Sequence, residues 1–295
     1  MRLSFAECSA RGRVAALLDK DSLEEWLPPS ARVMSPHLAE LGVPSAFDDG
    51  IVIGRGQLEG MTVLIAAQEG DFMGGSVGEV HGAKLVGLLQ RALCDRPAAV
   101  LLVAESGGVR LHEANAGLIA VSEVMRAVLD TRAAGIPVIA LIGGANGCFG
   151  GMGIVARCAD WVVMSDNARL AMSGPEVIEA SNGVEEFDSK DRALIWRTTG
   201  GKHRFLIGDC DALVDDDVDA FRAAAIVGLA HARKLTLESL ESEHALLSAR
   251  MRDAPAGGDA FALWREMGIE EPFHVPDLDA ADVASLRFGR TPAFT

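Results

Sequence analysis

Three clusters of glycine have the residue types and spacing that could do chemistry in this sequence. They are Gly74–Gly78 (GGSVG), Ser106–Arg110 (SGGVR) and Gly143–Gly153 (GGANGCFGGMG). Ordering glycine costs more conformational entropy than ordering any other residue, so a cluster usually lets backbone approach another group closely. The last two clusters each follow an apolar run and precede a predicted helix, whose first N–H groups lack internal partners. Such a loop can hold an anion, either a phosphate or a developing enolate oxygen.

The alternative for any single cluster is close packing of a helix on a strand. No G-x-x-x-x-G-K-[ST] motif occurs, so a P-loop is excluded, and Gly144–Gly150 has the wrong spacing for G-x-G-x-x-G. Because three clusters follow one another, two of them at strand-to-helix transitions, we favour a ligand over packing alone.

Side chains that could act as nucleophiles or metal ligands are poorly positioned. Neither Ser106 nor Cys148 lies in a G-x-S-x-G context, and we interpret Cys148 as a buried thiol. The histidines contain no i,i+4 pair and no H-E-x-x-H. We expect Arg110 and Glu113 to form an ion pair at the start of a helix. We predict neither a covalent nucleophile nor a metal.

A basic cluster stands out from a chain whose formal net charge is −15. Its members are Arg192, Arg197, Lys202, His203 and Arg204. They form either a solvated helix surface or a surface that receives the phosphates of a carrier arm or an acidic carrier protein. In the second case, charge reversal at Arg197 and Arg204 raises the Michaelis constant for the carrier-bound substrate.

Composition excludes several classes of protein. Of the 295 residues, 49% are hydrophobic and 23% charged, as in ordinary globular domains. The negative charge argues against nucleic-acid binding, which depends on lysine and arginine. The five cysteines are scattered without C-x-x-C spacing, which indicates neither a zinc ribbon nor a disulfide framework. No signal peptide or membrane-spanning run is apparent, so we expect a cytoplasmic protein that does not bind a membrane.

Alternating strands and helices position the glycine clusters. Residues 50–68 predict a hairpin that turns at Glu59–Gly60. Further strands are predicted at 98–105, 136–142, 160–166 and 168–174, and helices at 79–93, 113–134, within 150–159 and at 175–181. The order strand, strand, helix repeats about three times between residues 50 and 185, which favours an α/β fold arranged as a ββα superhelix.

This organisation divides the chain into three regions. Residues 1–49 are interpreted as an N-terminal arm of helix and loops, 50–235 as the α/β domain, and 236–295 as an acidic C-terminal helical extension. Within the extension we interpret Ala254–Gly258 as a linker, and the last residues as a tail that packs on this chain or on a partner.

Four motifs, in order, resemble those of the carboxyltransferase subunits of biotin-dependent acyl-CoA carboxylases, which have a crotonase-like ββα superhelix. The motifs are Phe72–Leu93, Ser106–Leu118 (SGGVRLHEANAGL), Gly143–Gly153 and Leu170–Glu179 (LAMSGPEVIE). Within that superfamily the chain is most similar to the β subunits of biotin-independent malonate decarboxylases. It has no N-terminal four-cysteine zinc module, its SGGVRLHEANAGL replaces the usual carboxylase pattern, and it has a C-terminal extension.

The resemblance implies an activity and its partners. The β subunit would work with a γ subunit to decarboxylate malonyl held as a thioester on a small acyl carrier protein, and the products would be acetyl carrier and carbon dioxide. The carrier's handle would be a CoA-like phosphopantetheine group, and neither biotin nor a metal would be needed.

The resemblance also implies roles for residues. An enolate carries its charge mainly on the thioester oxygen, so catalysis needs donors aimed at that oxygen. By motif, the Gly150 and Gly151 N–H groups would form the oxyanion hole, with Gly107 and Gly108 as the opposite wall. The residues that would bind substrate are Gly74, Gly75, Ser76, Ser106, Arg110 and Glu113, the first three along the acyl-thioester channel. We expect Gly151→Val to abolish turnover while leaving the fold largely intact.

Other functions remain open from the sequence alone. A carboxyltransferase that moves carboxyl between biotin and an acyl-CoA would depend on an added biotin carrier. A crotonase-type hydratase or thioesterase would need acid–base carboxylates, for which Glu105 and Glu113 are the candidates. A non-catalytic scaffold would need a partner to complete any site.

Overall fold

A computed structural model of the chain describes residues 3–231, 233, 235–253 and 259–288. The linker predicted at Ala254–Gly258 lies outside the described residues. Within them, no helix is both long and apolar enough to cross a bilayer.

The described residues form a seven-stranded sheet in which the spatial order of the strands follows the chain. The strands are β1 (Glu24–Trp26), β2 (Ile51–Leu58), β3 (Met61–Gln68), β4 (Ala99–Ala104), β5 (Val138–Ile142), β6 (Trp161–Ser165) and β7 (Ala212–Val214). β1, β2 and β3 pair antiparallel, and each later pair is parallel. The predicted hairpin and the strands predicted at 98–105, 136–142 and 160–166 are confirmed.

The central strands bury both of their faces, as continuous apolar runs predict. Along β4, Val100 and Leu102 pack into the core on one face, whereas Leu101 and Val103 pack into the core on the other. Val100 aligns with Leu64 of β3 and with Val138 of β5, so the register continues each face from strand to strand. Every buried aliphatic side chain of this kind contributes about 1.5–3 kcal/mol.

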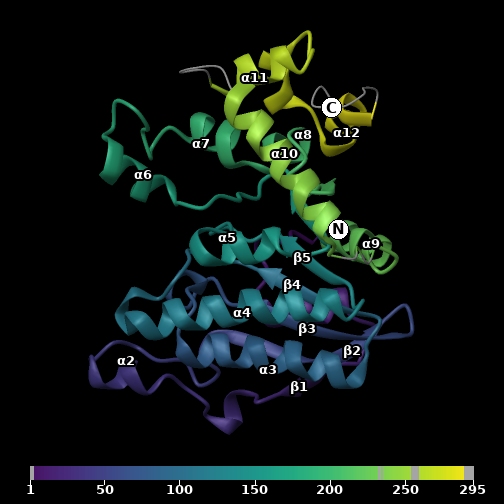
Figure 1. Ribbon diagram of the computed structural model, residues 1–295. Coiled ribbons are helices and arrows are strands. Elements are labelled where there is room, and N and C mark those ends of the chain that lie inside the picture. The colour runs from purple at the N-terminus through teal and green to yellow at the C-terminus, as the bar shows by residue number, and fades with distance from the viewer. Residues whose placement is uncertain (1–2, 232, 234, 254–258, 289–295) are drawn as a thin grey trace.

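Helices cover both faces of the sheet. The first helices of the chain are α1 (Ala10–Leu17), α2 (Pro36–Glu40), α3 (Glu79–Asp95), α4 (Asn115–Ala133), α5 (Gly150–Arg157) and α6 (Pro175–Asn182), and α9 spans Val218–Gly228. α3 and α4 lie side by side across one face, with α5 next to α4 (Figure 1). α1 and α9 pack on the other face, where Phe5 and Phe221 stack with ring centroids 3.9 Å apart. The predicted helices are confirmed.

The loops that follow the strands pair with one another through isolated β-bridges. Single-residue bridges join Val77 to Val109, Ser106 to Cys148, and Cys148 to Leu170. Each bridge takes the place of the second strand in a ββα unit. The prediction of a full strand at 168–174 is therefore wrong, since only Arg169 and Leu170 bridge there.

The N-terminal region is more than an arm of helix and loops, because β1 pairs with β2 and α1 packs against β3. β1 was not predicted, because its three residues, Glu-Glu-Trp, give no alternating pattern.

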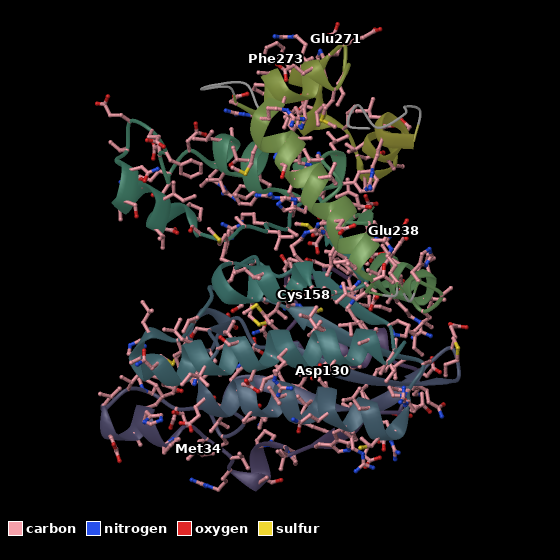
Figure 2. The ribbon with its side chains drawn as sticks, in the orientation of Figure 1. Met34, Asp130, Cys158, Glu238, Glu271 and Phe273 are labelled. Atoms are coloured by element: carbon pink, nitrogen blue, oxygen red, sulfur yellow. The ribbon has the colours of Figure 1, made fainter. Side chains whose placement is uncertain are left out.

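The C-terminal helices pack beyond the β7 end of the sheet. The remaining helices are α7 (Arg192–Thr199), α8 (Gly201–Leu206), α10 (Leu237–Asp253), α11 (Ala260–Glu266) and α12 (Ala280–Phe288). α12 contacts α8 and β7, and α11 contacts α7 (Figure 1). Glu271 and Phe273 mark the outer end of this extension, far from the sheet (Figure 2).

Candidate active site

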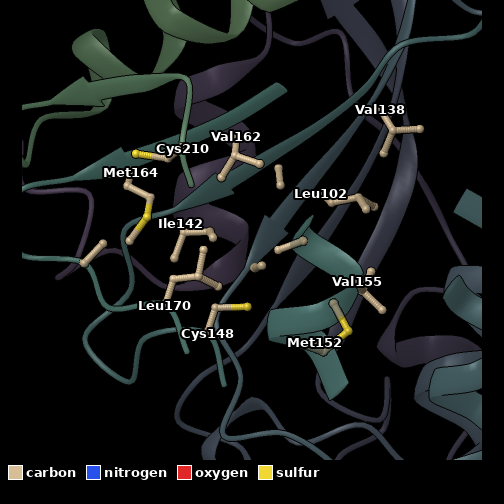
Figure 3. Packing of buried hydrophobic residues seen from close by; sticks show 14 of the residues in the cluster. Leu102, Val138, Ile142, Cys148, Met152, Val155, Val162, Met164, Leu170 and Cys210 are labelled. Carbon is tan, nitrogen blue, oxygen red and sulfur yellow. The ribbon is translucent and has the colours of Figure 1, made fainter. Parts of the chain in front are cut away.

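A cluster of buried apolar side chains, the apolar floor, lies under the glycine-rich loop Gly143–Gly153, which we call the oxyanion loop. Cys148, Met152, Val155 and Leu170 pack together with Ile142 at the end of β5 (Figure 3). Cys148 is fully buried, and burial raises the pKa of its thiol to about 12. A thiol with that pKa is not a nucleophile near neutral pH, so the interpretation of Cys148 as a buried thiol is confirmed.

Two of the glycine clusters meet at the N-terminus of α5. A Cβ built on Gly108 would lie 3.3 Å from the Gly150 Cα, and one built on Gly150 would lie 2.9 Å from the Gly108 Cα. Both residues have positive φ, +117° for Gly108 and +59° for Gly150. Glycine is therefore required at both positions for conformation and for close approach.

The hydrogen bonds decide which N–H groups of these clusters are available to a ligand. The Gly150 N–H donates to the Met172 carbonyl (3.0 Å), and the Gly107 N–H donates to the Gly74 carbonyl (2.7 Å). Within the described chain, the N–H groups of Gly151 and Met152 have no acceptor. This corrects the motif-based assignment of Gly150 as a donor. Gly151 and Met152 are the candidates, and Met152 was not predicted because the motif-based assignment named only glycines.

The Gly108 N–H is held by the Ser106 hydroxyl at 3.1 Å. The same hydroxyl lies 3.4 Å from the Gly108 carbonyl, and the Ser106 side chain is buried. Ser106 therefore shapes the wall formed by Gly107 and Gly108. Within this wall, Gly107 is exposed and Gly108 is buried.

Gly151 faces helix α4 as well as the site. A Cβ at this position would lie 2.5 Å from Cγ1 of the buried Val121. The expectation that Gly151→Val leaves the fold largely intact is therefore wrong, because a β-branched side chain would push α5 away from α4.

The loop Gly74–Ser76 forms a tight turn beside Ser106. Gly74 and Gly75 have φ of +65° and +67°, and a Cβ on Gly75 would collide with the Glu105 carbonyl. The Ser76 hydroxyl donates to the Met73 carbonyl at 2.8 Å, so it is engaged within its own turn.

Arg110 and Glu113 form the predicted ion pair, with Nη1 and Oε1 2.9 Å apart. Arg110 Nη1 also contacts Asp49 at 2.9 Å, and the side chains of all three residues are buried. Glu113 Oε2 accepts the Glu79 N–H that begins α3 (2.6 Å). Arg110 and Glu113 are buried against Asp49 and α3, and the terminal nitrogens of Arg110 and both oxygens of Glu113 are engaged within the chain.

The protonation of this buried group follows from its surroundings. Burial raises the pKa of Asp49, more than the Arg110 guanidinium lowers it. Burial also opposes ionisation of Glu113, but hydrogen bonds, led by the Glu79 N–H, lower its pKa below the usual range. Glu113 is therefore an ionised structural carboxylate at neutral pH.

A second buried ion pair, which the sequence analysis missed, supports the oxyanion loop from behind. Arg13 Nη1 of α1 contacts Glu105 Oε2 at the end of β4, and both side chains are at most 5% exposed. Glu105 Oε1 accepts the Asn146 N–H at 3.0 Å, and Asn146 donates to the Gly70 carbonyl at 2.9 Å. Because both Glu105 oxygens are engaged, Glu105 is not poised as the acid–base group of a hydratase.

The basic cluster is used largely within the chain. Arg204 pairs with Asp209 at 2.9 Å, and Arg197 lies 3.4 Å from Asp259. Lys202 Nζ donates to the Pro276 carbonyl at 2.6 Å. These three side chains are partly buried, and two of them contact the C-terminal extension, whereas Arg192 of the same cluster is exposed.

Several large apolar side chains are exposed on α4, α5, α6 and the loops near them. Leu111 is 84% exposed, Met172 is 72% exposed and Ile119 is 63% exposed. Leu118, Ile154 and Val177 are exposed as well. The five cysteines are free thiols, and the described residues contain no group of three or more His, Cys, Asp or Glu side chains suited to a metal.

Comparison with known proteins defines the class. Residues 7–227 match the family model of the carboxyl transferase domain. The chain is 40% identical over 291 residues to the malonyl-S-ACP:biotin-protein carboxyltransferase of Malonomonas rubra, with 91% of each chain covered. It is 32% identical over 187 residues to an acetyl-coenzyme A carboxylase carboxyl transferase subunit beta of Fusobacterium nucleatum, with 59% of each covered. The chain therefore belongs to the carboxyl transferase domain family.

Among solved structures, the chain is similar to chains of malonate decarboxylases. One chain of a Pseudomonas malonate decarboxylase hetero-tetramer in complex with malonate has a TM-score of 0.82 and 42% identity, over 90% of this chain and 97% of that one. A Pseudomonas malonate decarboxylase hetero-dimer gives 0.66 and 38%, over 84% and 96%. These likenesses confirm the crotonase-like ββα superhelix and the resemblance to malonate decarboxylases, and the acetyl-coenzyme A carboxylase is the more distant relative.

Proposed function

We propose that this chain is the β subunit of a cytoplasmic malonate decarboxylase. With a γ subunit it converts malonyl, carried as a thioester on an acyl carrier protein, to the acetyl thioester and carbon dioxide. The observation that supports this best is the meeting of Gly108 with the N-terminus of α5, in a chain 42% identical to one of a malonate decarboxylase assembly.

The chemistry needs hydrogen-bond donors where charge develops. Loss of carbon dioxide leaves an enolate whose thioester oxygen sits at the Gly151 and Met152 N–H groups, at the positive end of α5. Each donor of this kind contributes about 3 kcal/mol, or roughly 10²–10³ in rate. The buried floor around Cys148 keeps water from one side of the site and strengthens these interactions.

The thioester reaches this position along the loops that face α5. Gly74, Gly75, Ser76 and Ser106 shape the channel, and Gly107 presents its exposed backbone to the acyl group. Arg110 and Glu113 act through position, because they fix the loop at Ser76 and the start of α3. The reaction uses neither biotin nor a metal, and the CoA-like phosphopantetheine arm is the substrate's handle.

A γ subunit covers the surface around the oxyanion loop. Exposed leucine, isoleucine and methionine side chains lie on α4, α5 and the loops near them, and exposed apolar patches mark interaction sites. The Pseudomonas relatives are a hetero-tetramer and a hetero-dimer, which is consistent with such a partner.

The test uses this chain co-expressed with its γ partner and a malonyl thioester, followed by mass spectrometry without biotin or metal. Formation of the acetyl thioester is the expected result. The second candidate is carboxyl transfer to a biotin protein, which the 40% identical Malonomonas rubra relative favours. Activity that appears only when a biotin protein is supplied would replace the first proposal by the second.

A further inference from the structure

A pocket of about 340 Å³ lies between the sheet domain and the C-terminal extension. Its walls include Asp166, which follows β6, and Lys202 of α8. Helix α7 contributes Arg192, Trp196 and Arg197. The extension supplies the remaining walls, Trp264 of α11 and Pro276. The extension contributes to this pocket because it packs against α7 and α8, with α11 on α7 and α12 on α8 (Figure 1).

The walls of this pocket are positive in a strongly acidic protein. Arg192, Arg197 and Lys202 contribute three cations, whereas Asp166 is the only carboxylate among the lining residues. Arg197 has a carboxylate nearby, Asp259 at 3.4 Å, and Lys202 donates to a neutral carbonyl. Arg192 is exposed at the pocket and has no carboxylate partner within the described chain.

Trp196 fixes two of the cations of this region. The Arg192 guanidinium lies 5.2 Å from the Trp196 ring centroid, and the Arg169 guanidinium lies 4.8 Å from it. Arg169 in turn donates to the Ala145 carbonyl in the oxyanion loop. A chain of contacts thus joins the pocket to the candidate active site.

Two buried N–H donors on residues that line the pocket have no hydrogen-bond acceptor among the described residues. They are the Nε–H of Arg197 and the indole N–H of Trp264. Trp264 is only 1% exposed, and leaving such a donor unpaired is costly. Burial raises the pKa of Asp166, although Lys202 opposes the shift. Burial therefore disfavours the negative charge of the one carboxylate that lines the pocket.

We propose that this pocket binds a phosphate group and that the C-terminal extension serves to complete it. Converging cations and unpaired N–H donors are the chemistry that recognises phosphate oxygens, with the planar arginine fork as the preferred donor. The phosphate comes either from the CoA-like arm of the substrate or from free phosphate. The first source rests on the proposed function, whereas the site itself does not.

The test measures binding rather than turnover. Trp196 and Trp264 line the pocket, so tryptophan fluorescence reports occupancy when CoA, pantetheine or inorganic phosphate is titrated into the complex with the γ partner. The variants are Arg192→Gln and Lys202→Gln, and the matched control is Arg126→Gln on α4, whose partners are Glu123 and Asp130. Loss of one charge-assisted contact weakens binding by about tenfold or more.

We expect CoA to bind, with affinity lowered about tenfold or more by each pocket variant and unchanged by the control. Pantetheine, which carries no phosphate, should be insensitive to the variants. Displacement of CoA by inorganic phosphate only at much higher concentration identifies the arm as the source, whereas equal affinities identify free phosphate. Equal binding of phosphate and CoA by wild type and both variants, or no binding of either, overturns the proposal. Because no outcome depends on decarboxylation, the proposed function can fail separately.

Discussion

At the scale of single residues, the proposed site is a set of backbone groups held in place by buried side chains. Gly151 and Met152 offer N–H groups, and Gly108 and Gly150 approach each other closely. The Ser106 hydroxyl fixes the wall formed by Gly107 and Gly108. A change that adds one methyl group at the open edge of the site therefore tests the assignment with little disturbance elsewhere.

Gly107→Ala is that change. Gly107 is exposed, its φ is not positive, and a Cβ would make an ordinary 3.5 Å contact with the Gly74 carbonyl. We expect the free energy of unfolding to change by no more than about 0.5 kcal/mol. We expect kcat/KM for a malonyl thioester to fall by roughly 10²-fold, because the methyl group displaces the acyl thioester from its donors.

Gly87→Ala on α3 is the matched control, because a Cβ there meets nothing within 4 Å. Its turnover should equal that of the wild type. Full activity of Gly107→Ala would remove the Gly107–Gly108 wall from the mechanism.

Arg110→Gln separates a positioning role from substrate binding. It leaves the buried carboxylates of Asp49 and Glu113 without their cation, which costs about 3–5 kcal/mol of unfolding free energy. Denaturant unfolding checks this, with Arg126→Gln as an exposed control expected to lose about 0–1 kcal/mol. A raised KM at unchanged stability would instead return Arg110 to the substrate-binding residues.

The sequence predicted the loops of the site but not the pairing within them. Glycine clusters indicate where backbone must approach closely, and that is local information. Whether the Gly150 N–H is free depends on Met172, and Arg13 meets Glu105 across 92 positions of the chain. Contacts of that kind are fixed by tertiary packing and leave no mark in the spacing of residues.

At the scale of elements, the central strands were predictable because each is a continuous apolar run, whereas the three-residue β1 was not. The second strand of each ββα unit was not, since one bridging residue has no period. The N-terminal helix α1 was interpreted as part of an arm, yet it carries the side chain that supports the oxyanion loop.

Arg13→Gln tests that support. Release of Glu105 should free the Asn146 N–H, so hydrogen exchange at residues 144–147 speeds up and kcat falls more than KM rises. Arg11→Gln on the same helix, whose side chain is 43% exposed, should change neither. If hydrogen exchange at Asn146 were as slow in Arg13→Gln as in the wild type, α1 would not hold the loop.

At the scale of the whole molecule, two buried histidines make stability depend on pH. Burial lowers the pKa of His81 and of His203 to about 3 from the ordinary 6.5. The unfolded chain takes up these protons below about pH 6.5, whereas the folded chain does not until far lower pH. The stabilisation is therefore present above pH 6.5 and is lost as pH falls, by up to about 1.4 kcal/mol per pH unit for each histidine.

Unfolding free energies between pH 5 and 6.5 check this dependence. His81→Gln should reduce the slope by about one proton, whereas His112→Gln, at an exposed position, should leave it unchanged. A slope equal to that of the wild type in His81→Gln would mean that His81 is protonated in the folded protein.

The central claim is that this chain and its γ partner stabilise the enolate of a malonyl thioester without a biotin acceptor. The most direct measurement is mass spectrometry of malonyl-pantetheine incubated with the complex in D2O, with biotin omitted. The expected product is acetyl-pantetheine that carries one solvent-derived deuterium at the α-carbon, where the enolate is protonated. Unchanged malonyl-pantetheine, converted only after a biotin protein is added, would contradict it.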